Sequence, residues 1–194
     1  MKKIVLASKS PRRSELVSSL GLSFEIIPSS FDENLKGKEF SYDLINNVSK
    51  NKALDVAKKV QFPAVVIGAD TVVVMGKEIF LKPADEQDAF NILKKLSGKT
   101  HEVITSITVT DTETMHSETE AVTSKVTFRE LSDGQIWDYI KTKKPLDKAG
   151  AYGIQELDES FVKSLEGSKD NVIGLDTDCL KKLLIKLDKS FAIY

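Results

Sequence analysis

The chain has 194 residues, of which 41% are hydrophobic and 29% are charged, so it is long enough for one folded unit with its own core. Its 28 Lys and Arg residues nearly balance its 29 Asp and Glu residues, and the formal net charge of −1 argues against a basic protein that coats nucleic acid. One cysteine and two histidines exclude an internal disulfide framework and a Cys-rich zinc site, and they argue against a His-based metal centre.

The pattern of residues at the beginning of the chain does not fit a secretory signal. The apolar run Ile4–Ala7 is too short for one and gives way at once to polar residues. No stretch approaches the roughly 20 apolar residues of a membrane-spanning helix. We therefore expect a soluble, cytoplasmic protein with neither a membrane nor a nucleic acid as its partner.

Strands and helices are expected to alternate in the first half of the chain. Ser10 and Ser41 precede apolar patterns with a period of 3.6 and can cap helices. Pro11 follows the first cap, where its missing N–H leaves no hydrogen bond unmade. The expected elements are a strand at 4–7, a helix from 11 to the turn at Gly21, a strand at 24–27, a helix from 42 to about 60, a strand at 64–68 and a hairpin at 72–81.

Antiparallel strands are expected to dominate the second half. The expected elements are a helix at 85–96 closed by Gly98, strands at about 102–110 and 121–129, a helix capped by Ser132, a strand at 161–165 and a helix at 178–187 capped by Thr177. No repeat, low-complexity tract or flexible linker interrupts them. The sequence therefore predicts a single α/β domain over residues 1–194, with a mixed sheet, flanking helices and a cleft.

A phosphate-binding segment is the first functional hypothesis. In Ser8–Arg13 a strand end, a hydroxyl-rich turn and a helix start follow one another. Free backbone N–H groups and the positive end of the helix dipole would then face the same place as Arg12 and Arg13. Arginine can bind two phosphate oxygens at once, so this arrangement suits a polyphosphate. The alternative is a capped helix whose two arginines are solvated.

Carboxylate and lysine candidates follow later in the chain. Asp70 comes directly after an apolar strand, so we expect it at the carboxyl end of that strand, where open α/β sheets bind ligands. It would hold Mg²⁺ or activate a water there, with an aspartate in a tight turn as the alternative. Lys52 and Lys82 are candidate charges for phosphate, although a surface lysine is usually only solvated.

The glycine-rich segment Ala149–Gln155 is a candidate for base recognition. Its glycines permit close backbone approach, and Gln155 offers both a donor and an acceptor to a base edge. A plain glycine-rich turn is the alternative. Residues 97–100 look like the end of a Walker A loop, but Leu93 stands where the first glycine is required, and a helix precedes the strand instead of following it.

Taken together, these motifs resemble one family, the Maf nucleoside triphosphate pyrophosphatases, or septum-formation inhibitor-like proteins. Each motif is weak alone, but their order is specific and runs through nearly the whole chain. The matching segments are Leu6–Arg13, Glu33, Lys52–Ala53, Ile67–Val72, Lys82–Pro83, Leu96–His101 and Asp147–Gln155. The resemblance implies a two-lobed α/β fold around a long mixed sheet, with the site between the lobes. It also implies hydrolysis of a nucleoside triphosphate to the monophosphate and pyrophosphate, with a divalent cation.

The resemblance also implies roles for individual residues of the catalytic cleft. Asp70 matches the family's proton acceptor. Glu33, Lys52 and Lys82 match polar residues that line the cleft. Mg²⁺ or Mn²⁺ would bridge phosphate oxygens to Glu33 and Asp70, and a water oriented by Asp70 would attack the α-phosphorus.

Substrate recognition is assigned by the same resemblance. Ser8, Arg12 and Arg13 match the phosphate-binding loop. Arg12, Thr71 and Gln155 match positions associated with base choice, and the surrounding residues look like the subgroup that acts on dTTP and UTP. After Gln155 many relatives continue with a glycine-rich turn, whereas this chain has the acidic residues 156–160, which we interpret as a solvated loop.

Other functions remain open at this point. A modified purine such as 7-methyl-GTP is an alternative substrate, and a subgroup with that activity differs at the residue after the aspartate. A non-catalytic, nucleotide-binding regulator of septum formation is a second alternative, and an unrelated phosphatase that releases free phosphate is a third. The family also allows a homodimer, although no residue pattern in this chain predicts one.

Overall fold

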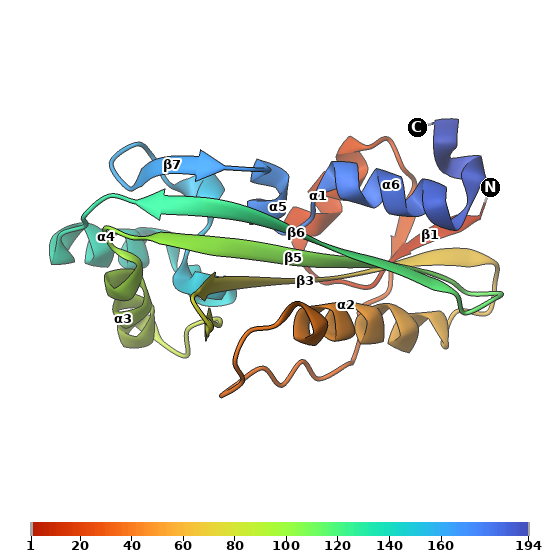
Figure 1. Cartoon of the computed structure of the whole chain (residues 1–194), viewed down its shortest axis with the longest axis horizontal. Coiled ribbons are helices and arrows are strands. Elements are labelled where there is room, and N and C mark those ends of the chain that lie inside the picture. The colour runs from red at the N-terminus through yellow and green to blue at the C-terminus, as the bar shows by residue number, and fades with distance from the viewer. Residues whose placement is uncertain (1, 194) are drawn as a thin grey trace.

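The computed structural model describes residues 2–193, which form one mixed sheet with helices on both faces (Figure 1). The strands are β1 (Lys3–Leu6), β2 (Phe24–Ile26), β3 (Ala64–Met75), β4 (Glu78–Phe80), β5 (Thr100–Asp111), β6 (Ser117–Phe128) and β7 (Val162–Glu166). The α-helices are α1 (Pro11–Ser19), α2 (Tyr42–Ala57), α3 (Glu86–Leu96), α4 (Asp133–Lys143), α5 (Lys169–Ile173) and α6 (Thr177–Leu187). Short 3-10 helices lie at Pro145–Asp147, Ala149–Ala151, Ile154–Glu156 and Lys189–Ile193.

The strand order is β2-β1-β3-β5-β6-β7, with β4 paired to the end of β3. β1 pairs in parallel with β2 and β3, and every other pairing is antiparallel. Helices link β1 to β2 and β2 to β3, as parallel neighbours require, whereas tight turns join the antiparallel pairs β3–β4 and β5–β6. The predicted α/β class, with a mixed sheet and flanking helices, is therefore confirmed.

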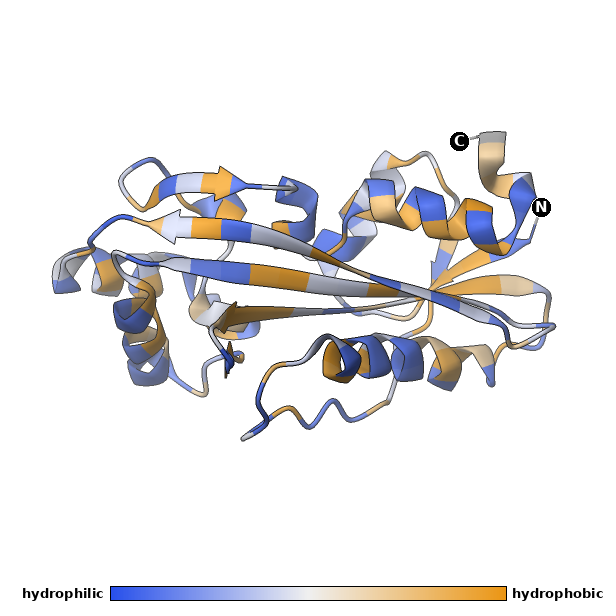
Figure 2. Cartoon of the chain, in the orientation of Figure 1, coloured by the Kyte–Doolittle hydropathy of each residue, from blue (hydrophilic) through white to orange (hydrophobic). Residues whose placement is uncertain are grey.

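Both faces of β1 are buried, and its side chains alternate between two layers of helices. Ile4 and Leu6 pack in a core that includes residues of α1 and α6, whereas Val5 and Ala7 pack against α2. This alternation is the period of two expected of a strand covered on both sides. The hydropathy colouring shows apolar residues toward both ends of β3 (Figure 2).

Two lobes share the long strands. One core contains residues of β1, α1 and α6 on one part of β3, and another contains α3, α4 and Tyr152 on its far end. Ile67 belongs to the first core and Val73 to the second. A stretch of β3 between them is left free to carry polar side chains, and this stretch holds Asp70 and Thr71.

Close packing of α2 on β3 depends on Gly68. A Cβ atom at this position would lie 2.4 Å from the Ser49 carbonyl oxygen and 2.7 Å from the Ala53 nitrogen. Only a glycine therefore lets the backbones of the helix and the strand approach so closely. This contact places Lys52, on the same helix, beside Asp70 on the same strand.

Several predicted boundaries were wrong. β3 runs without interruption from Ala64 to Met75, so Asp70 lies within a strand and not after its carboxyl end. β6 begins at Ser117 and not at 121, because polar residues pair with β5 as regularly as apolar ones do. Asp176, not Thr177, caps α6, accepting a hydrogen bond from the Cys179 N–H. The short α5 and the 3-10 helices carry too few residues for a hydrophobic period and were not predicted.

No helix within residues 2–193 is long and apolar enough to cross a bilayer.

Candidate active site

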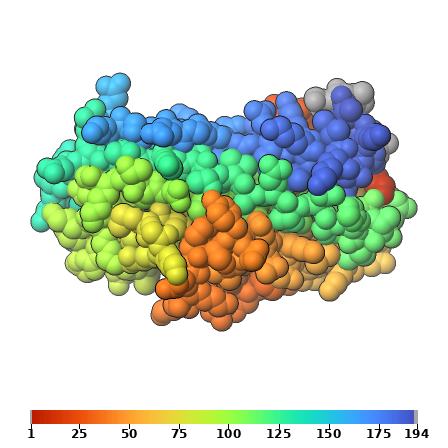
Figure 3. Space-filling view, in the orientation of Figure 1, coloured from red at the N-terminus to blue at the C-terminus, as the bar shows by residue number. Residues whose placement is uncertain are grey.

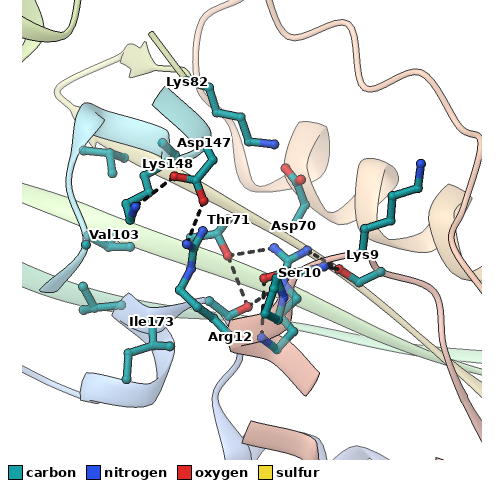
Figure 4. A pocket seen from close by; sticks show the side chains of 18 of the residues that line it. Lys9, Ser10, Arg12, Asp70, Thr71, Lys82, Val103, Asp147, Lys148 and Ile173 are labelled. Atoms are coloured by element: carbon teal, nitrogen blue, oxygen red, sulfur yellow. Dashed lines mark hydrogen bonds and ion pairs between the residues drawn. The ribbon is translucent and has the colours of Figure 1, made fainter. Parts of the chain in front are cut away.

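A cleft of about 470 Å³ opens between the two lobes (Figure 4). The loop after β1, the loop before α2, the middle of β3 and the segment 147–155 form its walls. All nine residues proposed from the sequence line it: Ser8, Arg12, Arg13, Glu33, Lys52, Asp70, Thr71, Lys82 and Gln155. The fold thus brings together residues that are up to 147 positions apart, as the two-lobed arrangement implied.

Lys52 joins two carboxylates at the centre of the cleft. Its amine lies 2.7 Å from Asp70 Oδ1 and 2.6 Å from Glu33 Oε1. Lys52 and Asp70 are 7% and 4% exposed, whereas Glu33 comes from the irregular loop before α2 and is exposed. Because the lysine is buried, these ion pairs are screened less by solvent than pairs on the surface.

The loop that carries Glu33 is fixed at both ends. Near its start, Asp55 of α2 accepts hydrogen bonds from the backbone and hydroxyl of Ser30. Near its end, the Phe40 N–H donates to the carbonyl oxygen of Lys77, in the turn after β3, at 2.9 Å. The space-filling view shows the orange residues of this region projecting beside the yellow turn (Figure 3). Glu33 is therefore held at the mouth of the cleft even though its side chain is exposed.

The two carboxylates have different proton affinities. Burial raises the pKa of Asp70, and the positive charge of Lys52 opposes this only in part. Burial acts on Glu33 in the same direction, but the charges of Lys52, Lys82 and Arg13 together hold the pKa of Glu33 below its usual value. Asp70 is therefore the more basic of the pair, which is the property required of a proton acceptor.

The donors present fit a hard divalent cation. Asp70 Oδ2 is buried and has no hydrogen-bond partner among residues 2–193, and Glu33 supplies a second carboxylate close by. No group of three or more His, Cys, Asp or Glu side chains within the described chain could form a closed metal site. Two carboxylates with several open positions suit Mg²⁺ or Mn²⁺, which take waters and substrate phosphate oxygens as their other ligands.

Arg13 is fixed by hydrogen bonds on three sides. Its Nε donates to the Gly174 carbonyl oxygen at 2.9 Å, and its two terminal nitrogens donate to Ser8 Oγ at 3.3 Å and Thr71 Oγ1 at 3.1 Å. Desolvation lowers the pKa of Arg13, although the nearby carboxylate of Asp70 favours its charge. A guanidinium group stays charged at any physiological pH, so Arg13 presents a fixed positive charge to the cleft.

The hydroxyl of Thr71 is occupied within the protein. It accepts from Arg13 and lies 2.9 Å from Thr105 Oγ1, and Thr105 itself donates to the carbonyl oxygen of Asn171. The single proton of Thr71 therefore goes to Thr105 or to the Gly174 carbonyl oxygen, which lies 3.3 Å away. Thr71 thus acts on the cleft by orienting Arg13.

Ser8 keeps a donor for a ligand. Its oxygen accepts from the Ser10 N–H at 3.2 Å and from Arg13, which leaves the hydroxyl proton free to donate. Ser10 caps α1 as predicted, by accepting from the Arg13 N–H, and Pro11 begins the helix. A donor hydroxyl, a helix N-terminus and Arg13 therefore lie together where phosphate oxygens would bind.

A chain of ion pairs crosses the cleft on the other side. Asp147 accepts from Arg12 at 3.0 Å and from Lys148 at 2.9 Å (Figure 4). Lys148 also pairs with Glu156 at 3.2 Å. Sequence reasoning gave no role to Asp147 or Lys148, although both stand in a matching motif. What the structure adds is the burial of Lys148, which is only 8% exposed. Interpreting Glu156 as part of a solvated loop was wrong, because Glu156 is half-buried and paired.

Comparisons with known proteins show which family the chain resembles. A family model described as "Maf-like protein" matches residues 3–187. A protein of Acetivibrio thermocellus named "dTTP/UTP pyrophosphatase" is 47% identical over 95% of this chain and 94% of its own length. A protein of the same name from Thermoanaerobacter is 44% identical over 98% of both chains. The solved structure of a HAM1 protein from Coxiella burnetii has a TM-score of 0.49 and 17% identity over 96% of this chain and all of that one.

Proposed function

The chain belongs to the Maf-like protein family, and from this premise we propose that it hydrolyses nucleoside triphosphates, above all dTTP and UTP, to the monophosphate and pyrophosphate. One observation supports this most strongly: Lys52 holds Asp70 and Glu33 together in a cleft that Arg12, Arg13 and Lys82 also line. A triphosphate needs several positive charges, and its hydrolysis needs a base. The cleft contains candidates for both.

Asp70 is the group proposed to orient and deprotonate the attacking water. Its buried carboxylate has one oxygen paired with Lys52 and the other without a protein partner within residues 2–193. A water at that second oxygen would face the α-phosphorus of a bound triphosphate. Because burial raises the pKa of Asp70, it holds a proton more readily than an exposed aspartate does, while Lys52 keeps enough of it ionised to act as a base.

The cations of the cleft stabilise the charge that develops on the leaving pyrophosphate. Arg13 is held rigidly and needs no reorganisation when the charge appears. Lys82 extends from the opposite lobe, and its amine is directed toward Asp70 (Figure 4). A divalent cation, bound at Asp70 and Glu33 together with the substrate phosphates, would supply further neutralisation of charge there.

Base choice is proposed to reside in the segment of the cleft that ends at Gln155. Gly153, Ile154 and Gln155 line the cleft beside Lys148. Thymine and uracil present an acceptor next to an N–H donor, and an amide side chain can match both. Arg12, held by Asp147, lies on the same side as this segment. A pyrimidine triphosphate is therefore the substrate class that we propose.

The products formed from dTTP separate this function from its alternatives. We expect dTMP and pyrophosphate in equal amounts when the protein is incubated with dTTP and Mg²⁺ or Mn²⁺, with UTP accepted and 7-methyl-GTP a poorer substrate. Anion-exchange chromatography of the nucleotides and a coupled pyrophosphate assay make the measurement. Free phosphate with dTDP would indicate a phosphatase instead. Tight binding of dTTP without any product would indicate a non-catalytic regulator.

A further inference from the structure

Glu156 forms a bridge behind the wall of the cleft. Its Oε1 lies 3.2 Å from the Lys148 amine, and its Oε2 accepts a hydrogen bond of 2.8 Å from Tyr139 Oη. Tyr139 lies on α4 and is buried, and its oxygen also accepts from the Gly153 N–H at 3.0 Å. The bridge therefore joins three parts of the far lobe: helix α4, Lys148 and the turn 153–156.

The direction of each hydrogen bond is fixed by the groups involved. The Gly153 N–H can only donate, so Tyr139 accepts from it and gives its own proton to Glu156. Burial raises the pKa of Tyr139, so the phenol stays protonated and remains a donor. Glu156 accepts from a phenol on one side and an ammonium group on the other, which is the stronger, charge-assisted kind of hydrogen bond.

The same bridge supports the backbone that carries Gln155. A Cβ atom on Gly153 would lie 3.0 Å from Lys148 Cε, so the lysine stem packs directly against this glycine. Residues 154–156 form a single 3-10 turn, in which Gln155 and Glu156 are adjacent. Any movement of Glu156 would therefore move Gln155 and displace the backbone groups that line the cleft.

Discrimination between pyrimidines needs such a support. Uracil and thymine present an acceptor at O4 and a donor at N3, whereas cytosine presents the opposite pair. The amide of Gln155 could rotate to match either pattern, and no hydrogen bond to another residue within 2–193 fixes its orientation. A preference for one pattern must therefore come from groups that cannot rotate, namely the backbone groups of residues 153–155 that line the cleft. These groups keep one position relative to the bound base only if the turn itself is held in place.

We propose that Glu156 and Tyr139 are positioning residues that set the base preference of the cleft by fixing the turn 153–156. The proposal rests on the proposed function, since it concerns the base end of the same substrate. Neither side chain lines the cleft, so they act through Gly153, Gln155 and Lys148.

The test compares Glu156→Gln and Tyr139→Phe with the wild type and with Glu159→Gln. The control removes an exposed carboxylate of the same segment that is outside the bridge. We expect both bridge variants to raise KM for dTTP about five-fold or more and to lower the preference for dTTP over dCTP by a similar factor, with kcat within about two-fold. The double variant should be no more impaired than the more impaired of the two single variants, because both changes break the same bridge.

Two results would overturn the proposal. One is an unchanged dTTP-to-dCTP preference in a folded bridge variant, and the other is a loss confined to kcat. Calorimetric binding of non-hydrolysable α,β-imido analogues of dTTP and dCTP gives a second readout that needs no turnover. If the wild type binds these analogues selectively but releases no pyrophosphate, the proposed function is contradicted. The binding selectivity of the variants would still decide whether the bridge sets the base preference. Either single variant carries the test if the other folds poorly.

Discussion

The Asp70→Asn variant is expected to lose turnover of dTTP by about 10²-fold or more, the usual scale for removing a general base. Asparagine keeps the shape of the side chain and can still contact Lys52, but it cannot accept a proton from water. KM should change much less, because Arg12, Arg13 and Lys82 remain in place to bind the triphosphate. Steady-state kinetics with pyrophosphate detection measure both constants.

The matched control for this variant is Asp111→Asn. Asp111 is also a buried aspartate, on β5, and it pairs with Lys2 far from the cleft. Its replacement should leave kcat close to the wild-type value. Thermal unfolding should show that the Asp70→Asn variant is folded, because the amide can still contact Lys52 and Glu33 remains paired with that lysine. Near-normal turnover by folded Asp70→Asn protein would rule out Asp70 as the base.

Replacing Lys52 with Gln is expected to shift the pH dependence of the reaction. Asp70 acts as a base only when it is unprotonated, so activity falls as the pH falls through its pKa. Lys52 lowers that pKa against the effect of burial. Without Lys52, Asp70 would take up a proton in preference to remaining an unpaired buried charge. The acidic limb of the profile of kcat against pH should therefore move to higher pH by about one unit or more.

At neutral pH the Lys52→Gln variant should accordingly be much less active, and it should recover part of the loss as the pH is raised. Lys59→Gln is the control, because Lys59 also pairs with an aspartate, Asp55, but is exposed. That control should keep the wild-type profile. A variant at position 52 whose loss of activity is the same at every pH would show that Lys52 does not tune Asp70.

The sequence predicted which residues line the cleft more completely than it predicted the bounds of the elements that carry them. The segment before Asp70 is an apolar run, and Ser10 is a helix cap. Both patterns have local causes that can be recognised in the sequence. The position of Asp70 inside β3 was not predictable in this way, because a Gly-Ala-Asp-Thr stretch is typical of a turn. Pairing with β5 along ten successive residues overrides that local preference.

Interactions between distant segments were the part that could not be predicted. The Thr71 hydroxyl contacts Arg13 and Thr105, which only the folded chain brings together. Glu156 resembles a solvated acid until Lys148 and Tyr139 are placed beside it. In both cases the residue types were visible, whereas the partners come from segments that are brought together only when the chain folds.

The position of attack is the central claim, and hydrolysis of dTTP in ¹⁸O-labelled water tests it most directly. A water oriented by Asp70 toward the α-phosphorus leaves its oxygen in the nucleotide. Mass spectrometry of the products from a single turnover should therefore find the label in dTMP and none in pyrophosphate. Label in pyrophosphate would mean attack at the β-phosphorus, and it would contradict the arrangement of base and leaving group proposed for this cleft.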